Sequence, residues 1–230
     1  MDRAKVICHM MTTIDGKIAI DWEGNEDYGI VGAKYDALIS DYGEAYGCGR
    51  NTFQYLPESD LSKFSGEKVE YKDNIIAPKV GQFLVVAFDR YGKLRWNSNI
   101  MKYGGRESLI VEVITEQVKP EFLTYLKSLN IPYIFAGKTE FEPELFLKKI
   151  KELYKVNTFV LCGGAGINAA FFESDMIDEI SLVIGAAIDG NHDGLTFVGA
   201  EKPKTFPKFF HFKELERVGE DGIILRYTKD

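Results

Sequence analysis

Six short segments of the chain are apolar at nearly every position and rich in β-branched and aromatic residues. A strand that is apolar on both faces is buried on both faces, which is typical of the interior of a largely parallel sheet. Apolar residues also recur at helical spacing in residues 122–129 and 145–153, with charged residues on the opposite side. Strands that alternate with helices predict an α/β fold with helices flanking the sheet. The expected strands are residues 6–11, 83–88, 109–114, 131–136, 158–162 and 180–187.

The last part of the chain has a different pattern. Residues 208–218 and 222–228 flank Gly219, Glu220 and Asp221, which predicts two antiparallel strands joined by a short turn. We therefore expect a mostly parallel central sheet with an antiparallel C-terminal hairpin. No repeat, low-complexity tract or linker divides the chain, so a single domain over residues 1–230 is expected.

The charge balance narrows the class of partner. The chain has 28 Lys and Arg residues and 35 Asp and Glu residues, which leaves a formal net charge of −7. A nucleic-acid binder normally presents a broad basic face, so this composition disfavours nucleic acid and favours a small-molecule substrate. Any phosphate on that substrate or on a cofactor must then be held locally, by backbone N–H groups or by a few placed cations.

Cysteine usage and hydropathy predict a cytoplasmic protein. The three cysteines, Cys8, Cys48 and Cys162, are scattered and form no C-x-x-C pair. The first residues lack a signal-peptide pattern, and charged residues interrupt every apolar run before it could span a membrane. The three histidines show no metal-ligand spacing, so no metal site is expected.

The first candidate site is a glycine-rich turn between an expected strand and an expected helix. Gly163, Gly164 and Gly166 follow the strand at 158–162, and a helix is expected from Ile167. Glycines at such a junction let the backbone approach a pyrophosphate, while the helix N-terminus supplies N–H donors and a favourable dipole. The alternative is that the glycines only make a tight turn. Their number and position favour contact with a phosphate or a dinucleotide.

A Rossmann dehydrogenase that uses NAD is a competing interpretation of the same turn. Starting from Gly164 the sequence fits G-x-G-x-x-A, and an acidic residue, Asp189, follows the next expected strand. That motif normally begins its domain, whereas here it lies near the end of the chain and a hairpin follows it. We keep this interpretation as the minority alternative.

A second glycine turn comes earlier in the chain. Gly47 and Gly49 end an expected strand, and Arg50, Asn51 and Thr52 open a short helix. Thr52 could give its hydroxyl to a phosphate, and the Arg50 guanidinium could bind a phosphate monoester with two parallel hydrogen bonds. A solvated arginine in a turn is the alternative. With two such turns in one acidic chain, we expect one to take a pyrophosphate and the other a 2′-phosphate, which would select NADPH over NADH.

The third candidate segment directly follows the first strand. Thr12, Thr13 and Asp15 lie at the carboxyl edge of the expected sheet, where open α/β sheets bind ligands. Asp15-Gly16 is also a common turn dipeptide, so a simple bend with a solvated Asp15 is the alternative.

These segments together resemble the dihydrofolate reductase-like superfamily, and most closely the 5-amino-6-(5-phosphoribosylamino)uracil reductases of riboflavin biosynthesis. Residues 13–19 (TIDGKIA) are similar to the opening motif of that family, and residues 49–52 (GRNT) resemble the G-R-x-T turn of dihydrofolate reductases. Residues 162–180 resemble the segment of the riboflavin reductases that begins E-G-G. Two departures are clear: Cys162 replaces the glutamate of that motif, and residues 54–58 lack the family's substrate-side segment.

The resemblance implies a three-layer dihydrofolate reductase-like fold, NADPH as cofactor, hydride transfer to a heterocycle or to an imine or carbonyl carbon, and a homodimer. We expect Gly163, Gly164, Ala165, Gly166, Ile167 and Asn168 to hold the pyrophosphate and the adjoining ribose. We expect Arg50 to bind the 2′-phosphate and Thr52 a phosphate oxygen, within a cofactor-binding segment that comprises Gly47, Gly49, Arg50, Asn51 and Thr52.

The expected catalytic residues are Thr13 and Asp15. The nicotinamide would lie near Thr13 and Gly47, and Asp15 would donate the proton, with a bound water as the alternative donor. These assignments require the two glycine turns to converge on one cofactor. A non-catalytic NADP(H)-binding regulator or sensor stays open as a second function, because the substrate side of the chain departs from the family motif.

Overall fold

The computed structural model describes residues 2–18, 26–53, 61–64, 70–200 and 203–229. They form two compact units, each built from two separate stretches of the chain. Unit 1 comprises Met1–Ala4 and Glu44–Asn157, and unit 2 comprises Lys5–Gly43 and Thr158–Asp230. The single domain expected from the sequence stays a prediction.

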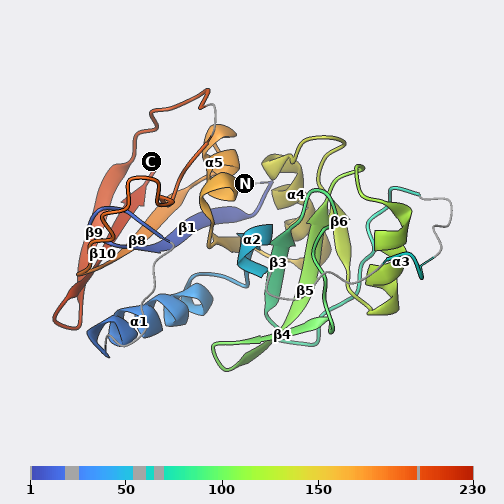
Figure 1. The fold of residues 1–230 in the computed structure, drawn as a ribbon, viewed down its shortest axis with the longest axis horizontal. Coiled ribbons are helices and arrows are strands. Elements are labelled where there is room, and N and C mark those ends of the chain that lie inside the picture. Colours follow the sequence, from blue (N-terminus) through green and yellow to red (C-terminus); the bar gives the residue numbers. More distant parts are fainter. Residues whose placement is uncertain (1, 19–25, 54–60, 65–69, 201–202, 230) are drawn as a thin grey trace. The chain divides into compact units, whose positions relative to one another are not determined.

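Unit 1 contains a mostly parallel sheet with one antiparallel edge strand (Figure 1). Strand β3 lies between β2 and β5, so that Val86 is opposite Gly47 on one side and Val111 on the other. Strand β6 extends the parallel part beside the second half of β5, and β4 runs antiparallel to the first half. The strands are β2 (Ala45–Gly49), β3 (Leu84–Phe88), β4 (Ile100–Tyr103), β5 (Arg106–Ile114) and β6 (Tyr133–Phe135), and the helices are α2 (Arg50–Phe53), α3 (Pro120–Ser128) and α4 (Pro143–Tyr154).

Unit 2 contains a second set of strands in the order β7-β1-β8-β10-β9. The first three are parallel, and β8, β10 and β9 are antiparallel, as expected for a C-terminal hairpin. The strands are β1 (Lys5–Thr12), β7 (Thr158–Leu161), β8 (Glu179–Gly185), β9 (His211–Val218) and β10 (Gly222–Thr228), and the helices are α1 (Glu26–Tyr42) and α5 (Ala165–Glu173).

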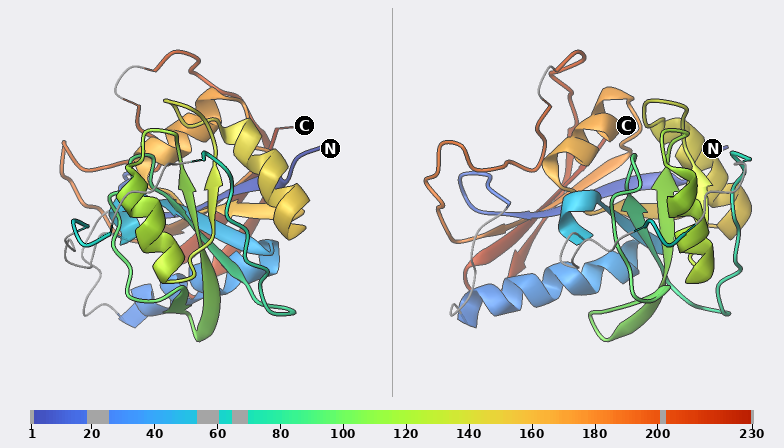
Figure 2. Two further views of the ribbon diagram at one scale, coloured as in Figure 1. Left: turned by 90° about the vertical axis from the view of Figure 1, so that its right-hand side faces the viewer. Right: turned by 45° about the vertical axis from the view of Figure 1, so that its right-hand side comes forward.

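Helices α1 and α5 lie on opposite faces of the sheet of unit 2 (Figure 2). Side chains of β1 therefore alternate between them. His9 faces α1, where its ring stacks on Tyr35 with the ring centroids 4.4 Å apart. Met10 faces the other way, against Gly163 at the start of the α5 segment. The face on α1 closes over a buried cluster of Val31, Leu38, Val183, Val218 and Ile224.

The α/β architecture, the parallel strands and the antiparallel C-terminal hairpin confirm the sequence predictions. Two elements were missed, strand β4 and helix α1. Strand β4 forms a hairpin with β5 through Gly104 and Gly105, both with positive φ. Helix α1 contains Gly29 and Gly32, which weaken helix propensity, and it is held by packing on the sheet. Among the helices in the described residues, none is long and apolar enough to cross a membrane.

Candidate functional site

The glycine turn of unit 2 connects the end of β7 to the start of α5. Gly163 has φ +84°, and a Cβ at this position would lie 2.7 Å from Cε of Met10. A residue with a side chain therefore fits neither the backbone conformation nor the space. Gly164 is the N-cap of α5 and makes no side-chain capping hydrogen bond. The turn thus brings bare backbone to the end of a buried strand, as the sequence predicted.

The start of α5 can hold an anionic group. The first N–H groups of a helix have no partner within the helix, and the helix dipole favours negative charge there. A Cβ placed on Gly166 would meet no atom within 4 Å, so the space beside the first turn is open. The backbone N–H groups of Ala165 and Gly166 are therefore suited to bind a pyrophosphate, and the described side chain nearest to a Cβ placed on Gly164 is Ile18, whose Cδ1 would lie 3.9 Å away.

Asn168 connects this turn to the loop at residues 197–199, which was not among the candidate segments. Its side chain is fully buried, and Nδ2 donates a hydrogen bond of 2.6 Å to the carbonyl oxygen of Phe197. Gly199 N–H donates to the carbonyl oxygen of Ala165 at 3.2 Å. The Oδ1 atom of Asn168 is buried and has no hydrogen-bond partner among the described residues. Asn168 therefore anchors the loop through its amide nitrogen and has one acceptor atom left for a ligand or a water.

Asp15 holds the turn after β1 to residues 189–190, which lie in the connection between β8 and β9. Thr13 Oγ1 donates to Asp15 Oδ1 at 2.5 Å, and Lys17 N–H donates to Thr13 Oγ1 at 2.8 Å. The carboxylate of Asp15 also accepts the backbone N–H groups of Asp189 at 3.1 Å and Gly190 at 2.9 Å. Thr13 and Asp15 thus belong to one hydrogen-bonded cluster that connects the exit of β1 to the segment after β8.

These hydrogen bonds argue against Asp15 as the proton donor. The Thr13 hydroxyl and the Gly190 N–H group lower the pKa of Asp15 to about 2. Both donors stabilise the charged carboxylate, so Asp15 carries no proton to give near neutral pH. Its geometry is that of a clamp on the loop, and the bound water that the sequence analysis kept as the alternative donor is favoured.

The second glycine turn belongs to unit 1. Gly47 and Gly49 lie in β2, Arg50 begins α2, and Asn51 and Thr52 are exposed. The next residue, Phe53, is buried against the ring of Trp96 with the ring centroids 5.6 Å apart, which fixes the short helix on the unit. The exposed polar residues of α2 are therefore presented on a well-packed support.

Arg50 and Thr52 each interact with a neighbour inside unit 1. Burial raises the pKa of Asp89, and the positive charge of Arg50 partly opposes that rise. The Thr52 hydroxyl forms a hydrogen bond with the thiol of Cys48, whose pKa is raised to about 12 by burial. A phosphate at this turn would meet an arginine whose charge already acts on a buried carboxyl group.

Unit 1 contains the expected residues of β2 and α2, from Gly47 to Thr52. Unit 2 contains the glycine turn at residues 163–168 and the expected catalytic residues Thr13 and Asp15. Their convergence on one cofactor stays a prediction, because the two turns belong to different units. The competing Rossmann interpretation gave Asp189 a role at a ribose. Asp189 is exposed, and its backbone N–H group binds Asp15.

Two buried carboxyl groups of unit 1 were missed. Asp89 directly follows β3, and Glu112 lies within β5 and accepts a hydrogen bond from the indole Nε1 of Trp96. The position of Asp89 at the carboxyl end of a buried strand could have identified it, by the same rule that selected Thr13 and Asp15. No local pattern marks Glu112, which stands in an apolar run.

Comparison with known proteins agrees with this architecture. The family model described as the RibD C-terminal domain matches residues 4–224. The 2,5-diamino-6-ribosylamino-4(3H)-pyrimidinone 5′-phosphate reductase of Aquifex aeolicus is 29% identical over 110 residues, which is 47% of this chain and 48% of the relative. The match thus spans about half the length of that curated relative.

Solved structures with 12–16% sequence identity share the fold over nearly the whole chain. Acinetobacter baumannii RibD superposes with a TM-score of 0.64 and 16% identity, over 99% of this chain and 58% of that one. A pyrimidine reductase-like protein from Corynebacterium diphtheriae gives 0.67 and 14%, over 98% and 91%. Saccharomyces cerevisiae Rib7 gives 0.64 and 12%, over 99% and 90%.

The family model covers residues 4–224, which is almost the entire sequence. The chain belongs to the RibD C-terminal domain family.

Proposed function

We propose that this chain is an NADPH-dependent reductase that transfers hydride to a phosphorylated pyrimidine, at an imine or carbonyl carbon or on the heterocycle itself. The observation that carries the proposal is the bare backbone at the start of α5, where Gly163 cannot carry a side chain and the space beside Gly166 is open. Membership of the RibD C-terminal domain family and the name of the Aquifex aeolicus relative supply the substrate class.

The residues on the cofactor side have separate tasks in this proposal. Gly163 to Asn168 hold the pyrophosphate and ribose, mainly through N–H groups that need no rearrangement when the anion binds. Gly47, Gly49, Asn51 and Thr52 line the second turn, and Arg50 binds the 2′-phosphate. When bound, NADPH supplies the hydride, so the chain needs no nucleophile of its own.

The residues on the substrate side position groups and exclude water. Asp15 holds the loop at residues 189–190 against the exit of β1, and Thr13 orients the Asp15 carboxylate. Because Asp15 remains ionised, the proton for the reduced product comes from a bound water. Thr13 and Asp15 thus act by fixing the geometry of the site.

Gly166→Leu tests the cradle without disturbing the fold. The new side chain projects into open space at the start of α5 and so leaves the packing intact. We expect it to weaken NADPH at least tenfold in a fluorescence titration, with little change in urea unfolding. Gly32→Leu is the matched control and should leave NADPH affinity unchanged. Gly32 is also a helical glycine where an added Cβ would meet no atom within 4 Å. It lies on α1, on the opposite face of the sheet from α5. Unchanged NADPH affinity in Gly166→Leu would overturn the assignment.

Arg50→Ala tests the cofactor preference. The loss of a charge-assisted contact is expected to weaken NADPH by about 1.5–3 kcal/mol and to leave NADH almost unaffected. Equal losses for both cofactors would remove Arg50 from the 2′-phosphate.

Turnover with the pyrimidinone 5′-phosphate named for the Aquifex aeolicus relative separates the two functions that the sequence left open. Oxidation of NADPH by that substrate supports the reductase. Tight binding of NADPH without any oxidation would support a non-catalytic NADP(H)-binding protein, which the departure of residues 54–58 from the family's substrate-side segment motivates. Residues 54–58 lie outside the described residues.

A further inference from the structure

Lys17, at the end of the turn that follows β1, binds a distant part of unit 2 through its side chain. Its Nζ atom donates to the carbonyl oxygen of Gly194 at 2.9 Å, and the carbonyl oxygen of His192 accepts a longer contact of 3.5 Å. Both acceptors belong to the segment that follows β8, residues 186–199, which we call the β8 loop. The stem of Lys17 lies close to the loop backbone, because a Cβ on Gly194 would be 3.2 Å from its Cδ atom.

The β8 loop is acidic where Lys17 meets it. It contains Asp189 and Asp193 but no lysine or arginine of its own. A Cβ on Gly194 would lie 2.8 Å from Oδ2 of Asp189, so this carboxylate and the stem of Lys17 approach the same glycine. Asn191 closes the turn between them, since its side-chain oxygen accepts the N–H group of Asp193 at 3.1 Å. Lys17 therefore brings a positive charge to an acidic turn that carries none.

Lys17 and Asp15 bind opposite polar groups of the β8 loop. The Asp15 carboxylate accepts backbone N–H groups near the beginning of the loop, whereas the Lys17 ammonium donates to carbonyl oxygens further on. Thr13 closes the turn that carries both charges, because its N–H group donates to the Lys17 carbonyl oxygen at 3.0 Å. Ile18 N–H then donates to the carbonyl oxygen of Leu195 at 3.0 Å. Asp15 thus fixes the start of the loop, and Lys17 fixes its middle.

The end of the β8 loop contacts the first turn of α5. Buried Asn168 donates to the carbonyl oxygen of Phe197 at 2.6 Å, and the Phe197 ring meets that of Phe172 with the centroids 6.4 Å apart. Gly199 N–H donates to the carbonyl oxygen of Ala165 at 3.2 Å. Movement of this segment would break both hydrogen bonds and release the Asn168 side chain. The shape of the start of α5 therefore depends on the position of the loop.

We propose that Lys17 is a positioning residue for the cofactor. Its ammonium group holds the β8 loop against the first turn of α5, and the loop keeps Asn168 and the neighbouring N–H groups in the arrangement that binds a pyrophosphate. Lys17 acts through the loop, so its contribution is to prepare the site before NADPH arrives. A site that is already ordered loses less entropy when its ligand binds. The inference rests on the proposed function, because the pyrophosphate site at α5 is part of that proposal.

Lys17→Met removes the ammonium group and keeps an unbranched stem that can lie beside Gly194. Amide hydrogen exchange of the chain without cofactor, followed by NMR, should become faster at Gly199, because that N–H group is protected only while the loop stays on α5. The affinity for NADPH in a fluorescence titration should fall about tenfold, the size expected for the loss of a charge-assisted hydrogen bond. Unfolding in urea should change little.

Two further variants separate positioning from a general effect of substitution. Lys17→Arg keeps the positive charge and several N–H donors, so it should restore both the slow exchange at Gly199 and the affinity for NADPH. Lys155→Met is the matched control, because Nζ of Lys155 also donates to a backbone carbonyl oxygen, that of Glu152 at 2.9 Å, at the exposed end of α4. This control should leave both measurements unchanged.

Unchanged exchange at Gly199 in Lys17→Met overturns the inference, and so does faster exchange with unchanged affinity for NADPH. Equal weakening of NADPH by Lys17→Met and Lys17→Arg also overturns it, because the loss would then not follow the donors of the side chain. Failure of the proposed function looks different: the unaltered chain would not bind NADPH at all. The exchange at Gly199 would then decide by itself whether Lys17 holds the loop.

Discussion

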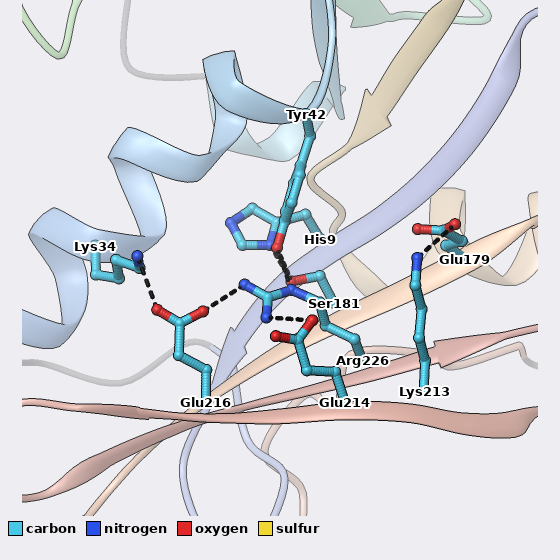
Figure 3. Close-up of polar contacts among 9 residues, drawn as sticks. All are labelled: His9, Lys34, Tyr42, Glu179, Ser181, Lys213, Glu214, Glu216 and Arg226. Carbon is cyan, nitrogen blue, oxygen red and sulfur yellow. Dashed lines mark hydrogen bonds and ion pairs between the residues drawn. The ribbon is translucent and has the colours of Figure 1, made fainter.

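Two buried polar clusters, one in each unit, satisfy their hydrogen bonds in different ways. In unit 2, His9, Ser181, Tyr42 and Arg226 form a continuous chain of hydrogen bonds between α1 and three strands (Figure 3). In unit 1, Glu112 accepts the indole N–H of Trp96 with one oxygen, and its other oxygen has no partner among the described residues. A complete network fixes a fold, whereas an incomplete one is accommodated by a change of protonation.

With a neutral His9 ring, each hydrogen bond in the unit 2 chain has one direction. A carbonyl oxygen only accepts, so His9 Nε2 carries the hydrogen that points to Tyr35 O at 3.0 Å. Nδ1 of the neutral ring then accepts from the Ser181 hydroxyl at 3.0 Å, and Ser181 accepts from the Tyr42 hydroxyl at 3.0 Å. Tyr42 in turn accepts from Arg226 Nε at 2.8 Å. For the neutral ring of His9, the network therefore defines one tautomer, with the hydrogen on Nε2.

The Arg226 end of the chain connects the network to β9. Arg226 Nη2 donates to Glu216 at 2.7 Å, and Lys34 on α1 lies 2.9 Å from the other oxygen of Glu216. Glu214 lies 3.2 Å from Arg226 Nη1 (Figure 3). The charges of this cluster are therefore at its partly exposed end, and the neutral groups are at its buried end.

The two clusters predict opposite responses of stability to pH, and the acid response of unit 2 is the largest effect. Burial lowers the pKa of His9 from 6.5 to about 4. Because the unfolded chain takes up the proton first, stability falls as pH drops from 6.5 to 4, by about 3 kcal/mol at 1.4 kcal/mol per pH unit. His9→Gln keeps a donor and an acceptor but cannot titrate. Urea unfolding of both proteins across this range should show the extra loss only with His9, and parallel curves would contradict the assignment.

Ser181→Ala breaks the unit 2 chain at its centre. The buried Nδ1 of His9 loses its donor and the Tyr42 hydroxyl loses its acceptor, so we expect the free energy of unfolding to fall by about 2 kcal/mol. Ser40→Ala is the control, since that hydroxyl is bonded to the Ala37 carbonyl at the partly exposed surface of α1 and its loss should change stability by less than about 0.5 kcal/mol. Equal effects of the two substitutions would show that the chain is not a specific network.

Glu112→Gln should change stability least at acid pH, and its effect should grow as the pH rises. At pH 3, below the unfolded pKa, the carboxyl group is protonated in the folded and the unfolded chain, so the amide should change stability by less than about 0.5 kcal/mol. As pH rises above the unfolded pKa, the unfolded chain ionises while buried Glu112 stays protonated, so the unaltered protein loses stability and the variant gains relative to it. A variant that loses stability relative to the unaltered chain with rising pH would show that Glu112 is ionised in the fold.

Local patterns were sufficient for most of the fold. The segment at 158–162 was predicted as a strand because it is apolar throughout, and the turn at Gly163 and Gly164 because consecutive glycines permit a backbone that other residues avoid. Helix α1 was not predicted, because its apolar residues show weak periodicity and its stability comes from packing on the sheet.

The site residues predicted from the sequence stay a prediction, and the structure shows only where they lie. Thr13 and Asp15 were placed correctly at the exit of β1, yet the low pKa of Asp15 depends on N–H groups from Asp189 and Gly190, far along the chain. A cleft of unit 1 that is lined by Lys93 and Lys119 was missed altogether, because these residues come from loops that become neighbours only when β3 and β5 pair.

The sequence by itself determined the strand and helix pattern, the glycine turn before α5 and the resemblance to a reductase family. These depend on backbone preferences and hydrophobic periodicity, which act over a few neighbouring residues. Only the tertiary structure decided which carboxyl groups are ionised, which tautomer His9 adopts and where cations gather. Those properties depend on burial and on hydrogen-bond partners that are distant in the chain, and no short segment of the sequence contains them.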